Sequence, residues 1–125
     1  SEIVTRTPIP VAKLETIIAL IPSDIDIEYT HIDAQGSDFD IIKSGGEALS
    51  RLNVVVLELH TTELYVNAPL KIDVMSWMSS KGFVYLGEVA KSSLEVDILF
   101  RNKNKELPEH VAPLQAIISR LEPQP

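Results

Sequence analysis

The sequence predicts an α/β domain with a mostly parallel sheet, helices on both of its faces and a closing antiparallel hairpin. Helix-like and strand-like segments alternate along the 125 residues, and such alternation is typical of parallel strands joined by right-handed helical crossovers. The segment "NVVVLELH" is apolar on both faces, as expected of a central parallel strand that is covered on each side. A chain of this length fits one domain.

The first half of the chain predicts two helices around one strand. "PVAKLETIIALIP" is expected to form an amphipathic helix between two prolines. Its apolar face consists of Leu14, Ile17, Ile18 and Ile21. The later part of "IDIEYTHIDA" is expected to form a strand. Ser37 then begins a helix, with Asp40 as its capping-box partner and Asp38 adding negative charge to the first turn. Gly45 and Gly46 interrupt this helix.

The second half predicts a further crossover and the hairpin. A helix after "NVVVLELH" ends at Gly82 in the C′ position. Its apolar stripe consists of Leu70, Val74, Trp77 and Met78. "FVYLGEVA" and "LEVDILFR" flank "KSS" and are expected to pair as the hairpin. Residues 1–102 then form the main domain, and residues 103–125 form a polar linker and an amphipathic helix from Val111 to Leu121.

Composition excludes several classes of protein. The chain has 11 basic and 18 acidic residues, for a net charge of −7. Because its Lys and Arg are scattered, we expect no nucleic-acid partner. No apolar run approaches the length of a membrane span, and the absence of cysteine excludes a disulfide framework and a thiolate metal site. We expect a soluble protein, whose compartment stays open with the cytoplasm favoured.

Polar residues follow two of the predicted strands at the point where each strand ends. They are Asp33, Gln35, Gly36 and Asp38 after one strand, and Glu58 and His60 at the end of the other. Ligands in open α/β sheets lie beyond the carboxyl ends of the parallel strands, so neighbouring strands would bring these groups to one rim. Gly36 allows a tight turn and the close approach of a ligand.

The two acids that interrupt apolar strand patterns are favoured as functional. An unpartnered charge is costly in such a position, and this applies to both Asp33 and Glu58. The acids near Ser37 also suit a purely structural role in helix capping. The sequence has no Gly-x-Ser-x-Gly elbow, which disfavours acyl-transfer hydrolysis.

The histidines have two interpretations. His31 and His60 suit packed or surface positions as well as ligand positions. A site combining Asp33, Glu58 and a histidine is conceivable, but no His-x-x-x-His or similar spacing supports one. We therefore expect no metal.

"HIDAQGSDFDIIKSGGEAL" followed by "NVVVLELH" resembles the FkbM-type family of S-adenosylmethionine-dependent methyltransferases. The family pattern is close to K-I-D-V-E/Q-G-x-E/D-x-x-V-L-x-G followed by an apolar strand that ends in Glu, and His31 stands where the family usually has Lys. "GFVYLGEV" and "VDILFRN" resemble the family's closing hairpin. The resemblance covers residues 8–102.

The resemblance implies the C-terminal half of a class I, Rossmann-like methyltransferase sheet. The five glycines include no Gly-x-Gly turn between a strand and a helix, so the N-terminal, glycine-rich cofactor half is expected to be missing and the chain to be a portion of a larger enzyme. The strand before Asp33 would then be a sheet edge. An exposed edge invites self-association or pairing with a missing N-terminal half.

The resemblance further implies methyl transfer from S-adenosylmethionine to a hydroxyl of a small molecule or sugar. In this interpretation Asp33 and Glu58 are catalytic, Gln35 and Gly36 contact the cofactor, and Asp38 and His60 contact the acceptor. One alternative is a catalytically inactive half-fold that acts as a binding or assembly module. Another is a small metal- or phosphate-binding domain with Asp33 as its principal acid.

Overall fold

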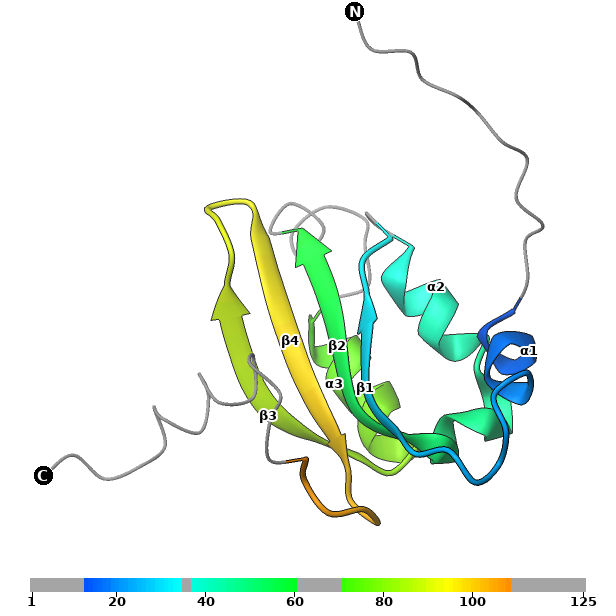
Figure 1. The fold of residues 1–125 in the computed structure, drawn as a ribbon. Helices are drawn as coiled ribbons and strands as arrows, with labels where there is room; N and C mark the ends of the chain where they lie inside the picture. Colours follow the sequence, from blue (N-terminus) through cyan, green and yellow to red (C-terminus); the bar gives the residue numbers. More distant parts are fainter. Residues whose placement is uncertain (1–12, 35–36, 61–70, 109–125) are drawn as a thin grey trace, which may run out of the picture.

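A computed structural model describes residues 13–34, 37–60 and 71–108 (Figure 1). Its elements in chain order are α1 (Leu14–Ala19), β1 (Ile27–Ile32), α2 (Asp38–Lys43), the 3-10 helix η1 (Gly46–Arg51), β2 (Leu52–His60), α3 (Lys71–Ser80), β3 (Phe83–Ala90) and β4 (Glu95–Asn102). The predicted C-terminal helix lies outside the described residues. None of the described helices is long and apolar enough to cross a membrane.

The four strands form one mixed sheet in the order β1-β2-β4-β3. β1 pairs with β2 in parallel, while β4 runs antiparallel to both β2 and β3. Three strands therefore share one direction, and the predicted hairpin of β3 and β4 is confirmed. The prediction of a mostly parallel sheet is correct for strand direction but wrong for strand pairing, because β4 lies between β2 and β3.

The described helices all contribute to one core on one face of the sheet. Val55 and Leu57 of β2 lie in this core, together with Phe100 of β4. The helices add Leu14 and Ile18 of α1, Ile42 of α2, Leu49 of η1, and Val74 and Met78 of α3. Figure 1 shows the helices on the same side of the strands. The prediction of helices on both faces is therefore not met within the described part of the chain.

The opposite face carries a smaller apolar cluster. Val54 and Val56 of β2 contact Leu99 of β4, and Tyr29 and Leu107 pack against them. We call the face that carries this cluster the second face of the sheet. Because side chains alternate along a strand, residues spaced by two from these positions lie on the same face, and they include His31, Glu58 and Asp97.

The Arg51 side chain binds backbone carbonyl groups at the end of the first helix and in the turn after it. Its guanidinium donates hydrogen bonds to the carbonyls of Ile18 at 2.9 Å, Ile21 at 2.8 Å, Pro22 at 2.7 Å and Ile25 at 3.2 Å. The last carbonyls of a helix have no partner within the helix, and Arg51 supplies one from η1. The observed helix α1 ends at Ala19, before Pro22.

The predicted capping box is wrong. Ser37 is at the N-cap of α2 but makes no side-chain capping bond. Asp38 instead turns inward and is buried, and its carboxylate accepts hydrogen bonds from the backbone N–H groups of Ala34 and Glu58, each at 2.9 Å. The helix breaks were predicted correctly, since Gly46 has φ +52° at the start of η1 and Gly82 has φ +90° after α3.

Candidate functional site

The parallel pair β1 and β2 places two acids side by side at its carboxyl end. Ile32 is opposite Leu57 in the register, so Asp33 lies next to Glu58. Asp33 is exposed, whereas Glu58 is only 3% exposed. Burial raises the pKa of Glu58, while its contacts with Glu95, with Lys91 and, least of these, with Asp33 lower it. The rim therefore combines one accessible carboxyl group with one buried group behind it.

Glu58 is held by groups from the hairpin. Lys91 donates a hydrogen bond from Nζ to Glu58 Oε2 at 3.1 Å. Burial would raise the pKa of Glu58, but hydrogen bonds with Glu95 and Lys91 outweigh burial and lower it. The same contact raises the pKa of the Glu95 carboxyl.

A second acid, Asp97, faces Glu58 across the sheet. The two residues are directly opposite in the β2–β4 register. His31 Nε2 lies 3.6 Å from Asp97 Oδ1 and 3.7 Å from Glu58 Oε2. Potential ligand atoms of His31, Glu58 and Asp97 all lie within 4.8 Å of one another. This arrangement is the group of described residues best suited to hold a metal ion.

Asp97 has an unusual environment for a carboxylate. It is 6% exposed, and its Oδ1 is buried without a hydrogen-bond partner. Burial raises the pKa of Asp97, while the nearby charges of Lys91 and His31 act in the opposite direction. Burial likewise raises the pKa of Tyr29, whose ring meets that of His31 edge-on with centroids 6.3 Å apart.

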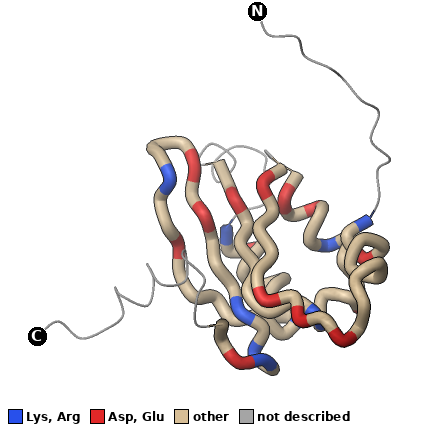
Figure 2. The backbone as a smooth tube through the Cα atoms, in the orientation of Figure 1, with Lys and Arg blue, Asp and Glu red and all other residues tan. Residues whose placement is uncertain are grey.

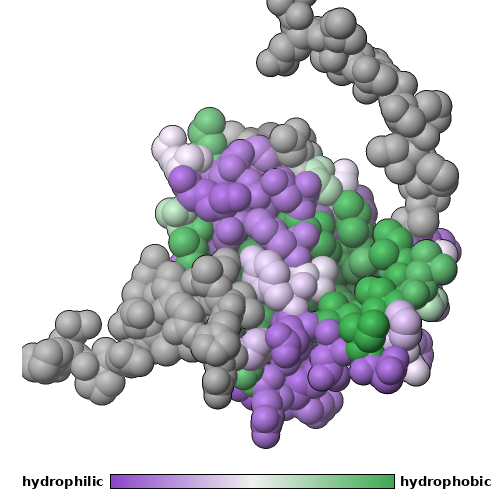
Figure 3. Space-filling view, viewed as in Figure 1, coloured by the Kyte–Doolittle hydropathy of each residue, from purple (hydrophilic) through white to green (hydrophobic). Residues whose placement is uncertain are grey.

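The acidic character of this end extends over its surface. Figure 2 shows Asp and Glu positions gathered where β1 and β2 finish, and Figure 3 shows a hydrophilic patch over the same end of the sheet. His60 ends β2 and is half-buried, opposite Glu95 of β4. The rim is thus lined by carboxyl groups with one lysine and two histidines among them.

The structure places the predicted residues in three groups. Asp33, Glu58 and His60 come together at the rim. Asp38 is buried, and each of its carboxylate oxygens accepts a backbone hydrogen bond, so its carboxylate serves the fold. Gln35 and Gly36 lie outside the described residues.

Sequence reasoning missed three members of the site. They are Lys91, Glu95 and Asp97, all from the hairpin. Only Asp97 carried a usable signal, because it interrupts the apolar pattern of "LEVDILFR" in the same way that Glu58 interrupts its own strand. That β4 lies beside β2 is what brings Asp97 to Glu58, and the sequence does not reveal this order.

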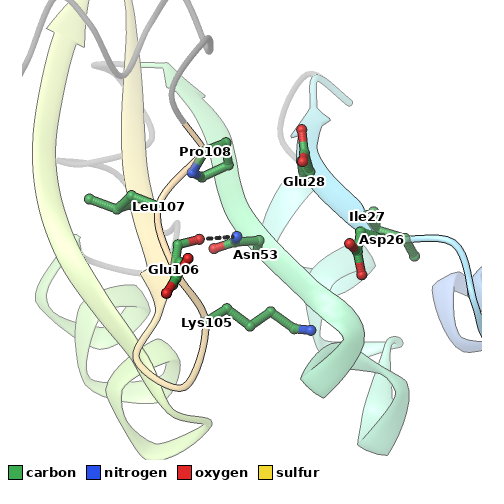
Figure 4. Close-up of a pocket in the computed structure, with 8 residues that line it drawn as sticks. All are labelled: Asp26, Ile27, Glu28, Asn53, Lys105, Glu106, Leu107 and Pro108. Carbon is green, nitrogen blue, oxygen red and sulfur yellow. Dashed lines mark hydrogen bonds between the residues drawn. The ribbon is translucent and has the colours of Figure 1, made fainter.

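A cavity among the described residues lies at the opposite, amino end of the parallel strands (Figure 4). It has a volume of about 470 Å³ and is lined by Asp26, Ile27, Glu28, Asn53 and residues 105–108. Asn53 donates a hydrogen bond to the carbonyl of Glu106 at 2.6 Å. The cavity contains none of the predicted site residues.

Among the described residues, no glycine lies in a turn between a strand and the start of the helix that follows it. A nucleotide-like cofactor favours a glycine turn at the start of a helix that follows a strand. The described glycines lie elsewhere: Gly45 between α2 and η1, Gly46 at the start of η1, Gly82 after α3 and Gly87 within β3.

Comparison with known proteins identifies one family. The family model described as methyltransferase FkbM domain matches residues 1–85, which is more than half of the chain and includes α1 to α3. The comparisons with curated proteins and with solved structures find no match.

Proposed function

The chain belongs to the methyltransferase FkbM domain family, and from this premise we propose that it supplies the acceptor side of an S-adenosylmethionine-dependent methyltransferase. The acceptor would be a hydroxyl group of a small molecule or sugar. The observation that carries the proposal is the exposed Asp33 carboxyl beside the buried Glu58 carboxyl, at the carboxyl ends of two parallel strands.

Asp33 is the proton acceptor in this proposal. When bound, S-adenosylmethionine supplies an electrophilic methyl group, and transfer to oxygen requires the hydroxyl proton to leave. An exposed carboxylate at the rim can reach that proton, and positioned bases of this kind contribute about 10²–10⁴-fold to a rate. His60 would orient the acceptor from the end of the neighbouring strand.

Glu58 acts through Asp33. It is too buried to contact an acceptor, with 3% exposure, but it lies within hydrogen-bonding reach of the Asp33 side chain. Lys91 donates a hydrogen bond to Glu58 Oε2 at 3.1 Å, so Glu58 is a fixed partner beside Asp33. Glu58 is therefore a positioning residue, since alignment of donor, acceptor and base governs displacement reactions.

The proposal is tested by methyl transfer from labelled S-adenosylmethionine to a panel of sugars and polyols. We expect transfer by wild type when this chain is joined to a glycine-rich cofactor half, and its loss in Asp33→Asn, which keeps the size of the side chain. Asp24→Asn is the matched control, because Asp24 is an exposed acid in the turn before β1. Undiminished transfer by Asp33→Asn would refute the role of Asp33, and no transfer by the joined wild-type protein to any hydroxyl would refute the proposed O-methylation.

The position of β1 favours a second candidate, assembly through the sheet edge. Among the described residues β1 pairs only with β2, and a strand with one unpaired side can add a strand from another chain. We expect sedimentation to show a dimer or larger species. A monomer over the accessible concentration range would exclude this candidate.

A further inference from the structure

We propose that His31, Glu58 and Asp97 form a binding site for a first-row divalent cation such as Mn²⁺ or Zn²⁺ on the second face of the sheet. The three residues come from the adjacent strands β1, β2 and β4. An imidazole nitrogen with two carboxylate oxygens suits cations between the hard and soft extremes. The site shares Glu58 with the proposed function, but cation binding would not depend on methyl transfer, so the two proposals can fail separately.

The geometry is close to that of a metal site. Ligand atoms at about 2.0–2.2 Å from one cation are separated from each other by about 3–4 Å. His31 Nε2 lies 3.6 Å from Asp97 Oδ1 and 3.7 Å from Glu58 Oε2, and the ligand set spans at most 4.8 Å. A small contraction of the side chains would therefore complete the coordination.

An independent observation shows that the site lacks a partner. Asp97 Oδ1 is buried and accepts no hydrogen bond, and it is the same oxygen that lies 3.6 Å from His31 Nε2. A buried carboxylate oxygen without a partner is costly. A cation among the three side chains would supply the missing partner.

A simple ion-pair network explains the arrangement less well. The distances of 3.6 and 3.7 Å from His31 Nε2 are too long for hydrogen bonds, so a protonated imidazole does not satisfy either carboxylate. Lys91 contacts Glu58 Oε2 at 3.1 Å, but its side chain is 39% exposed and can turn toward solvent. Lys91 is thus a competitor for the cation rather than the partner of Asp97.

The site is accessible at one of its three residues. His31 has a side-chain exposure of 31%, while Glu58 and Asp97 are buried. Three protein ligands leave at least one coordination position for water or another ligand, as in sites that exchange their fourth ligand. A cation could therefore enter past His31 without unfolding the sheet.

The test is a titration of the metal-free chain with Mn²⁺ alone, in which electron paramagnetic resonance measures free Mn²⁺, followed by displacement with Zn²⁺. We expect saturation at one ion per chain. Asp97→Asn should weaken binding by at least about tenfold, because even a lost outer-shell partner of a metal ligand costs about 10–100-fold. Lys91→Gln should tighten binding, since it removes the competing ammonium.

Two controls keep the result decisive. Asp24→Asn removes one exposed acid far from the cluster and should leave the affinity unchanged. Asp97→Asn removes a buried, unpartnered charge and should therefore fold, which the thermal unfolding midpoint would verify. Failure of wild type to bind Mn²⁺ or Zn²⁺, or equal binding by wild type and Asp97→Asn, would overturn the proposal.

Discussion

The carboxylate of Asp38 accepts a hydrogen bond from the backbone N–H of Glu58 at 2.9 Å, across the boundary between α2 and β2. Its other oxygen accepts from the N–H of Ala34, also at 2.9 Å. The buried Asp38 side chain thus connects the backbone at Ala34, just after β1, to the strand that carries Glu58. This contact holds Asp33 beside Glu58 and so maintains the rim.

Replacing Asp38 by Asn should destabilise the fold. The amide retains one acceptor oxygen but presents an NH₂ group to one of the two backbone N–H donors. A buried donor without a partner costs about 1–3 kcal/mol, so Asp38→Asn should lower the free energy of unfolding by about that amount in urea denaturation. Asp40→Asn is the matched control in the same helix turn. Its side chain is 85% exposed, and an equal loss in both variants would contradict the role assigned to Asp38.

Arg51→Lys should also destabilise the fold, although it keeps the charge. A lysine ammonium cannot reproduce the planar fork with which Arg51 reaches the carbonyls of Ile18, Ile21, Pro22 and Ile25. Hydrogen bonds from a charged donor are worth about 1.5–3 kcal/mol each, and we expect a net loss of about 1–3 kcal/mol because the lysine keeps part of them. Hydrogen exchange should be faster in α1.

The exposed position Lys103 provides the comparison for Arg51. Lys103→Arg exchanges the same two residue types where the side chain is exposed, and it should change the free energy of unfolding by less than about 0.5 kcal/mol. Unchanged stability in Arg51→Lys would show that the four carbonyls find other partners.

Local signals predicted much of the fold. The β-branched run in "NVVVLELH" gave β2, and Gly82 marked the end of α3 because a residue there adopts a left-handed conformation. The hairpin was predicted from two strand-like runs on either side of a short polar turn. These features depend on neighbours in the chain, which the sequence shows directly.

Features that depend on spatial order could not be predicted in this way. The sequence contains both strands of the hairpin but does not say which lies beside β2, so the pairing of Glu58 with Asp97 was missed. Asp38 illustrates the other difficulty. An acid at a helix start suits capping, ligand binding or an inward hydrogen bond equally well, and only the position of the Glu58 N–H decides between them.

The central claim is that this chain takes part in methyl transfer from S-adenosylmethionine, with Asp33 as the base. The most direct measurement is a calorimetric titration of S-adenosylhomocysteine into a protein that joins this chain to a glycine-rich cofactor half, with and without the Asp33→Asn substitution. The account predicts saturable binding to both proteins, because Asp33 serves the acceptor and not the cofactor. No saturable binding to the joined wild-type protein would contradict the account.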